Sequence, residues 1–121
     1  MTTGQIKKEI FEINGEEDFN RIALALFHYQ KEKVPVYRQF LKLTHRDESP
    51  VTHYSQIPCL PVTLFKNHVV TDSEQLPDVF FRSSGTEGSQ RSTHYIADPD
   101  LYRDSISHSF RFFYDDPSSY T

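Results

Sequence analysis

Residues 83–89 read Ser-Ser-Gly-Thr-Glu-Gly-Ser and contain the residue types with which proteins hold phosphate. Two of the chain's four glycines and four hydroxyl side chains fall within these seven residues. Glycine allows tight turns in which several backbone N–H groups point at one oxyanion, and hydroxyl groups add further donors. Strand-like runs precede the segment at residues 79–81 and follow it at residues 91–97. The sequence therefore predicts a phosphate-binding loop between two strands.

The expected phosphate ligands are the backbone N–H groups of residues 84–88 and the hydroxyl groups of the loop. The candidate set is Ser83, Ser84, Gly85, Thr86, Gly88 and Ser89, with Arg82, Arg91 and His94 as charged or polar partners. Glu87 opposes this interpretation, because a carboxylate repels phosphate unless it points away or holds a metal. The alternative is a hairpin loop of ordinary turn residues, since Ser, Thr and Gly also favour turns.

No other residue pattern predicts a site. The six histidines are scattered and have no metal-ligand spacing, so no metal site is expected. Cys59 stands between Pro58 and Leu60 without a nearby acid or base, and we expect a small buried side chain rather than a nucleophile. The aromatic residues of the last helical segment, Tyr102, Phe110 and Phe113, are expected to pack in the core, with an acyl pocket as the alternative.

Three helices are predicted from apolar spacing and capping residues. The first follows Asn14, a predicted cap with Glu17 three residues later, and runs to about residue 31. A second, short helix begins at Pro35, and the third runs from residue 99 to 114 after the cap Asp98. A short helix at 62–66 and a short strand at 68–70 are also expected. The fold class is mixed α and β, with a helical N-terminal half followed by a β–loop–β–α unit. The first helix has its apolar face at Phe19, Ile22, Ala23, Leu26 and Phe27.

The composition favours one soluble domain spanning residues 1–121. The net charge is −4 with both signs mixed along the chain, which argues against nucleic-acid binding. The chain has no apolar run long enough for a membrane span and no signal-peptide pattern at its N-terminus. A single cysteine suits a reducing compartment, so a cytoplasmic location is expected.

The order of residues in the loop resembles a known family. Phe-Arg-Ser-Ser-Gly-Thr-Glu-Gly-Ser, residues 81–89, is similar to the Ser-Ser-Gly-Thr-Thr-Gly nucleotide-binding loop of adenylate-forming acyl ligases. The surrounding sequence resembles one branch, the acyl-protein synthetases that supply fatty acid to the bacterial bioluminescence reductase. Three further segments look like that branch, and the resemblance spans about residues 10–115. These segments are residues 57–61 with Phe65, Lys66 and His68 after them; residues 91–95; and residues 101–114.

The resemblance implies ATP-dependent activation of a fatty or other carboxylic acid, usually with Mg²⁺. The products are an acyl-adenylate and pyrophosphate, and the acyl group then passes to a thiol on a protein cysteine or coenzyme A. By analogy, Ser83, Ser84, Gly85, Thr86 and Gly88 would hold the β- and γ-phosphates. The family's other active-site residues lie downstream of the matching region. We therefore expect an N-terminal fragment of the large N-terminal domain, which alone lacks catalysis although the parent protein is a ligase.

The second hypothesis is a non-catalytic interaction module that keeps the fold and has lost the nucleotide site. It is motivated by Glu87, which stands where the family's loop carries a second Thr. A fragment would also expose the apolar surface that its missing half covers, so self-association is expected.

Overall fold

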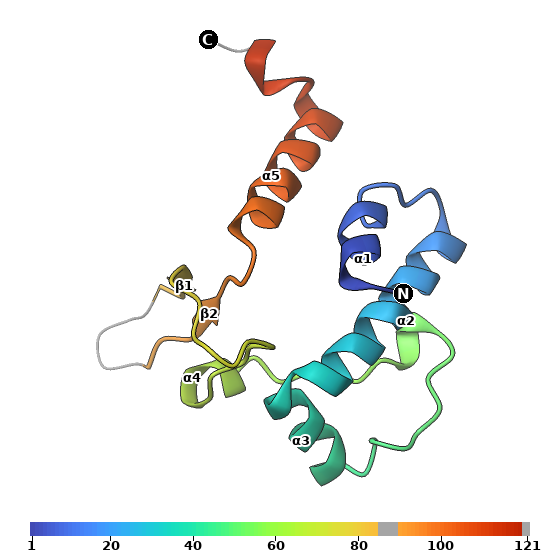
Figure 1. Cartoon of the computed structure of the whole chain (residues 1–121), viewed down its shortest axis with the longest axis vertical. Coiled ribbons are helices and arrows are strands. Elements are labelled where there is room, and N and C mark those ends of the chain that lie inside the picture. The colour runs from blue at the N-terminus through green and yellow to red at the C-terminus, as the bar shows by residue number, and fades with distance from the viewer. Residues whose placement is uncertain (85–89, 120–121) are drawn as a thin grey trace.

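The computed structural model describes residues 1–84 and 90–119, which form five α-helices and a two-stranded antiparallel sheet (Figure 1). The expected mixed α and β class, with its helices concentrated in the N-terminal half, is confirmed. Two 3-10 helices complete the elements. In chain order the elements are α1 (Thr3–Glu9), α2 (Glu16–Lys33), α3 (Pro35–Leu43), η1 (Tyr54–Gln56), α4 (Leu64–Asn67), β1 (Phe80–Arg82), β2 (Thr93–Tyr95), α5 (Pro99–Tyr114) and η2 (Pro117–Ser119).

Helix α2 begins differently from the sequence prediction. Its N-cap is Gly15, which has a φ of 108° and makes no side-chain cap, whereas Asn14 was the predicted cap. Asn14 instead donates its backbone N–H to the Asp18 carboxylate at 3.1 Å. Glycine reaches this left-handed φ without a steric cost, so the chain turns at Gly15 and the helix starts one residue later. Three acidic residues in the first turn then stabilise the helix, because their negative charges lie at the positive end of the helix dipole.

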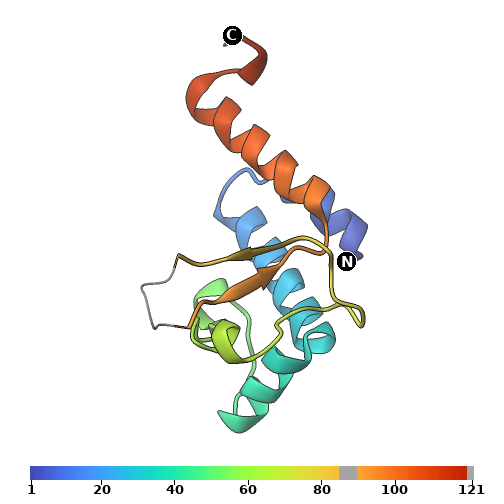
Figure 2. The ribbon, with the colours of Figure 1, turned by 90° about the vertical axis from the view of Figure 1, so that its left-hand side faces the viewer.

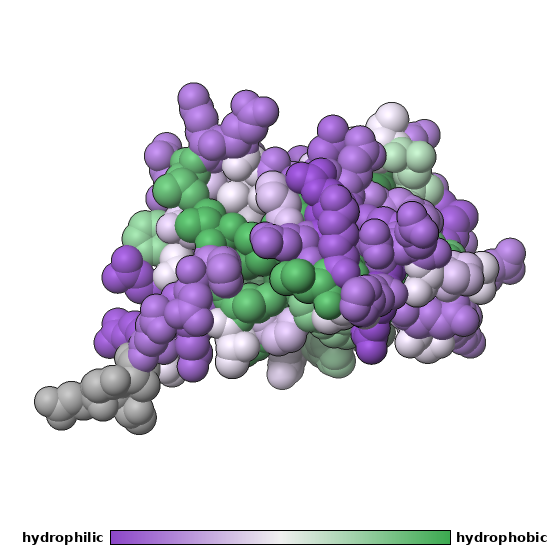
Figure 3. Space-filling view, turned by 90° about the horizontal axis from the view of Figure 1, so that it is seen from below, coloured by the Kyte–Doolittle hydropathy of each residue, from purple (hydrophilic) through white to green (hydrophobic). Residues whose placement is uncertain are grey.

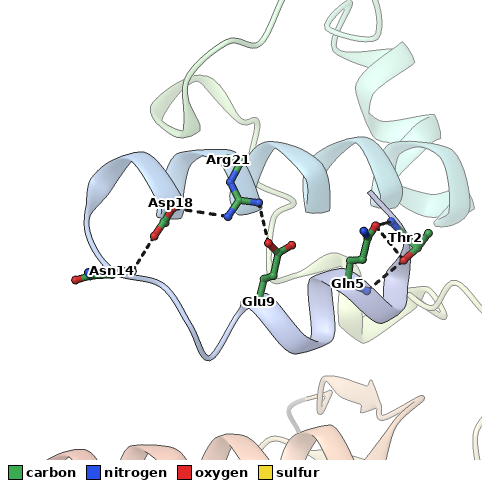
Figure 4. A network of polar contacts seen from close by, with 6 residues as sticks. All are labelled: Thr2, Gln5, Glu9, Asn14, Asp18 and Arg21. Atoms are coloured by element: carbon green, nitrogen blue, oxygen red, sulfur yellow. Dashed lines mark hydrogen bonds and ion pairs between the residues drawn. The ribbon is translucent and has the colours of Figure 1, made fainter.

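A network of polar contacts joins α1 to α2 (Figure 4). Thr2 and Gln5 form a reciprocal capping box at the start of α1, in which Thr2 Oγ1 accepts the Gln5 N–H at 3.2 Å. The Arg21 guanidinium lies 3.4 Å from the Glu9 carboxylate and 3.7 Å from Asp18. These ion pairs are exposed and contribute little, generally below about 1 kcal/mol each. Burial of Ile6 on α1 is therefore the larger stabilising contact.

The core lies between α2 and α3. The two helices meet at Val34, whose extended backbone ends α2 and precedes Pro35 at the start of α3, since proline disfavours a helical residue before it. Phe27, Val34, Tyr37 and Leu41 form the buried cluster. The buried Tyr37 hydroxyl donates to the carbonyl of Pro58 at 2.6 Å and so ties the following segment to the helices. Further partly buried side chains pack against this cluster: Phe40, Val51, Ile57, Leu60 and Val70.

Two local predictions from the sequence are wrong. Cys59 is exposed, because its neighbour Pro58 is the residue that turns toward Tyr37 and the core. The strand expected at residues 68–70 is not formed, and in the described part of the chain only β1 and β2 pair. The short helix expected at residues 62–66 is present as α4, shifted toward the C-terminus.

Helix α5 leaves the sheet and extends away from the helical body (Figures 1 and 2). Its start is as predicted, with the Asp98 carboxylate accepting the Leu101 N–H at 3.1 Å and Pro99 in the first turn. Two of the three aromatic residues expected in the core are not buried, since Tyr102 and Phe113 are 44% and 73% exposed, whereas the third, Phe110, is partly buried. Large apolar side chains are exposed elsewhere too, and the face in Figure 3 shows an area of hydrophobic residues between hydrophilic ones.

Candidate functional site

The hairpin of β1 and β2 carries the predicted loop. The strands pair in antiparallel register, with Phe80 opposite Tyr95 (Figure 2). Beyond the last strand pair, the Ser83 N–H donates to the Ser92 carbonyl at 3.0 Å. The Ser92 N–H in turn donates to Ser83 Oγ at 2.9 Å. The two serines therefore fasten the stem where the glycine-rich segment begins.

Only part of the predicted ligand set can be placed. Ser83 and Ser84 are described, whereas Gly85, Thr86, Gly88 and Ser89, and also Glu87, lie outside the described residues. The Ser83 amide is used within the stem, and its hydroxyl oxygen accepts from Ser92, which leaves the hydroxyl proton as its one remaining donor. Ser84 is exposed.

His94 supports the stem. Its Nε2 lies 3.0 Å from Ser92 Oγ, and Ser92 is only 4% exposed. The imidazole ring stacks on Phe65 of α4, with the ring centroids 4.6 Å apart and the planes 28° apart. His94 therefore contacts Ser92, which is hydrogen-bonded to Ser83 at the end of the stem, and it connects the hairpin to α4.

Cationic residues stand at both ends of the predicted loop. Arg82 and Arg91 are exposed, and the Arg82 guanidinium lies 5.2 Å from the centre of the Phe80 ring. The side-chain amide of Gln90 donates to the Lys66 carbonyl at 2.8 Å, which brings the backbone of α4 beside the end of the loop. The residue pattern did not single out Lys66, whose contact beside the loop is made by its backbone carbonyl. Its one signal in the sequence was its place in a segment resembling the ligase branch.

A cavity of about 550 Å³ lies between the helices α1 and α2 on one side and β2 and α5 on the other. The Tyr29 hydroxyl, on its wall, donates to the Asp72 carboxylate, and this bond, with burial as a second cause, raises the pKa of Tyr29. At the start of α5, Lys7 Nζ lies 2.7 Å from Asp98, and this hydrogen bond lowers the pKa of the Asp98 carboxyl. Sequence reasoning missed this cavity, because its walls come from segments far apart in the chain. Its apolar lining includes Ile6, Ile10, Phe11, Leu26, Ile96 and Leu101.

A second arrangement missed by the sequence joins a hydroxyl, an imidazole and a carboxylate. His53 Nδ1 lies 2.8 Å from Ser55 Oγ, and His53 Nε2 lies 3.7 Å from the Glu16 carboxylate. This order of groups is that of a catalytic triad. However, the His53 and Glu16 side chains are 43% and 73% exposed, and Nδ1 also accepts the Ser55 N–H at 3.2 Å. His53 therefore acts as the N-cap of η1.

Across residues 1–84 and 90–119, no helix combines the length and the apolar character that crossing a membrane requires. The same residues contain no group of three or more His, Cys, Asp or Glu side chains placed to hold a metal ion. Comparisons of the chain with protein-family models, with curated proteins and with solved structures found no match.

Proposed function

We propose that this chain is the N-terminal part of an ATP-dependent acyl-protein synthetase or acyl-CoA ligase-like enzyme. In this proposal, the loop between β1 and β2 holds the β- and γ-phosphates of ATP. The main support is a Ser-, Thr- and Gly-rich segment that begins where Ser83 and Ser92 fasten a hairpin stem, with Arg82 and Arg91 at its two ends. The choice of family is supported by the order of residues in the loop and in three flanking segments, which resembles that of the acyl-protein synthetases.

The reaction is the transfer of an adenylyl group. A carboxylate oxygen of the fatty or other acid attacks the α-phosphorus of ATP, and the bond from that phosphorus to the bridging oxygen of the β-phosphate breaks. Pyrophosphate leaves with the electron pair, so negative charge grows on the phosphates that the loop would hold. Fixed backbone amides and hydroxyls stabilise such charge without reorganising. The acyl group then passes to a thiol of a protein cysteine or coenzyme A, and AMP is released.

Mg²⁺ would accompany the nucleotide in this reaction. The described residues do not bring enough carboxylates together to form a cation site of their own. In this proposal the chain binds and orients the phosphate tail of the nucleotide. The residues that would complete catalysis belong, by the resemblance, to a downstream part of the parent enzyme.

The alternative is a non-catalytic interaction module that has lost nucleotide binding. Glu87 favours this alternative, because its carboxylate adds a negative charge to the predicted phosphate-binding loop and would repel the anionic ligand. The exposed apolar residues of α5 also suit a module that binds another protein surface. The two proposals differ in one measurable property, the affinity for Mg·ATP.

The Arg91→Ala variant is expected to bind Mg·ATP about 3–10-fold more weakly than the wild-type chain. Arg91 is an exposed cation at the loop's end, and losing one partly solvated charge-assisted bond to phosphate costs about 1 kcal/mol. Affinity is measured by isothermal titration and by displacement of a fluorescent ATP analogue. Arg103→Ala is the matched control, because it removes the same charge from an exposed position on α5 and should leave the affinity unchanged.

Glu87→Thr separates the two proposals. If it strengthens Mg·ATP binding that is already present, the nucleotide-binding proposal is supported. If the wild-type chain binds no ATP and Glu87→Thr restores binding, Glu87 prevents nucleotide binding in the wild-type loop and the module proposal is correct. Absence of binding to Mg·ATP and to pyrophosphate in both chains would rule out the phosphate-binding role.

A further inference from the structure

Helix α5 carries more exposed apolar surface than its contacts with the rest of the chain cover. Its contacts with the helices and the sheet, among the residues that the structure describes, include the stack of Phe11 on His108 with ring centroids 4.2 Å apart, the pair of Lys7 with Asp98, and the Phe81 and Tyr102 rings 5.2 Å apart. After the helix, Asp116 lies 4.0 Å from the Arg111 guanidinium. The 16 residues of α5 make a helix about 24 Å long. Helices of this length are only marginally stable in water without a packed face.

One face of α5 is uncharged along most of the helix. Tyr102, Ile106, Ser109 and Phe113 follow one another at spacings of four, three and four residues and therefore line up on one side. We name these four residues the α5 stripe. All four are exposed, with Ile106 at 54% and Phe113 at 73%. The charged residues of the helix lie outside the stripe; they are Asp100, Arg103, Asp104 and Arg111.

The α5 stripe contains both a projection and a hollow. Ser109 is the small member of the stripe, and a hollow of about 340 Å³ lies over this part of the helix, with Ile106 and Phe113 among its walls. Ile106 projects one turn away from Ser109. The spacing of the stripe reads the same in both directions along the helix. An antiparallel copy of α5 would therefore present its own Ile106 at the level of the hollow.

We propose that the α5 stripe is a homodimer interface, in which α5 of a second copy packs antiparallel about a two-fold axis between Ile106 and Ser109. In this register Ile106 of each copy lies over Ser109 of the other. Tyr102 of each copy meets Phe113 of the other, and aromatic pairs of this kind add to the energy of burial. The interface is isologous, as expected for a two-fold dimer. The proposal goes beyond nucleotide binding and does not depend on it.

A second copy fits this face for two physical reasons. The stripe holds no charge, so pairing it with itself buries no like charges, and antiparallel helices place opposite dipole ends side by side. The contact is small: two such stripes bury on the order of 800 Å² in total, below the roughly 1,000 Å² of a stable specific interface and in the range of a weak, transient one. We therefore expect a weak dimer, with a dissociation constant of roughly 10–100 µM.

Salt dependence distinguishes this interface from one made by ion pairs. Three carboxylates near the ends of α5 are already paired within one copy: Asp98 with Lys7 at 2.7 Å, Asp100 with Arg103 at 2.6 Å and Asp116 with Arg111 at 4.0 Å. Burial of apolar surface is not weakened by NaCl, whereas salt screens exposed ion pairs. Association through the stripe should therefore persist between low salt and about 0.5 M NaCl, whereas an interface made by ion pairs would weaken.

Sedimentation velocity of the whole chain from 5 to 500 µM, protein concentrations chosen on the order of the expected dissociation constant, tests the proposal. The wild-type chain should show a monomer–dimer equilibrium, and Ile106→Asp should weaken it more than tenfold. Leu43→Asp is the matched control, because Leu43 is 72% exposed on α3 and its replacement should leave the equilibrium unchanged. A wild-type chain that stays monomeric, or an Ile106→Asp variant that dimerises as well as wild type, would overturn the proposal.

Cross-linking tests the register without a charge that weakens the helix. In a Cys59→Ser background, Ile106→Cys mixed with Ser109→Cys should form a disulfide-linked heterodimer on mild oxidation. Asp104→Cys mixed with Ser109→Cys should not, because Asp104 lies off the stripe. Equal cross-linking of both mixtures would show that the chains associate through another surface.

Discussion

Replacing Phe27 with alanine is expected to lower the free energy of unfolding by about 3–5 kcal/mol. Phe27 is 3% exposed and belongs to the buried cluster between α2 and α3, where its ring meets Tyr37 edge-on with centroids 6.2 Å apart. The substitution removes the ring's burial and leaves a cavity that the surrounding helices fill only in part. Because domains are usually stable by only about 5–15 kcal/mol, much of this chain's stability depends on that side chain.

Phe112→Ala is the matched control for this experiment. Phe112 is 83% exposed on α5, so the same chemical change there should alter the free energy of unfolding by less than about 0.5 kcal/mol. Urea unfolding followed by circular dichroism measures both variants, at concentrations low enough to keep the chain monomeric. Equal destabilisation by the two substitutions would contradict the assignment of the core to α2 and α3.

The wild-type chain is expected to lose stability between pH 10 and pH 12 through Tyr37. Burial of the phenol, with a smaller contribution from the charge of the nearby Cys59, raises the pKa of Tyr37 to about 12. In the unfolded chain the same group titrates near 10. Below pH 10 the phenol is protonated in both states. Above pH 10 the unfolded state loses its proton first, so stability falls on the order of 2 kcal/mol by pH 12.

Tyr37→Phe separates the titration from the hydrogen bond. At neutral pH the variant should be less stable by about 1–3 kcal/mol, because the Pro58 carbonyl loses its donor in a buried place. The difference between wild type and variant should then shrink as the pH rises from 10 to 12. Tyr102→Phe, at an exposed position, is the control and should follow the wild-type curve. If the difference in stability between wild type and Tyr37→Phe stays constant with pH, Tyr37 ionises as readily in the folded state as in the unfolded state.

Local sequence patterns predicted most of the helices for reasons that act within a few residues. Pro35 and Pro99 favour the first turn of a helix, and Asp98 caps α5 as expected. The apolar spacing of α2 correctly identified Ile22 and Phe27 as buried. The same spacing included Phe19, which is 47% exposed and meets Tyr54 edge-on. A helix pattern shows which side chains share a face but not how far a partner covers that face.

The sequence by itself determined the class of fold, the helices α2, α3 and α5, and the place of the predicted loop between two strands, because propensity, capping and alternation are local properties. It did not determine the full order of elements, since the strand expected at residues 68–70 is not formed and the bounds of helix α1 were not predicted. Only the tertiary structure decided which faces are covered. Two contacts depend on residues from different segments: Ser92 donates to Ser83, and His94 stacks on Phe65. The exposure of the α5 stripe likewise depends on which other elements pack against α5. Such contacts depend on how whole elements pack against one another. The energy of packing is distributed over many side chains, and the spacing of these side chains in the sequence does not show which of them will be in contact.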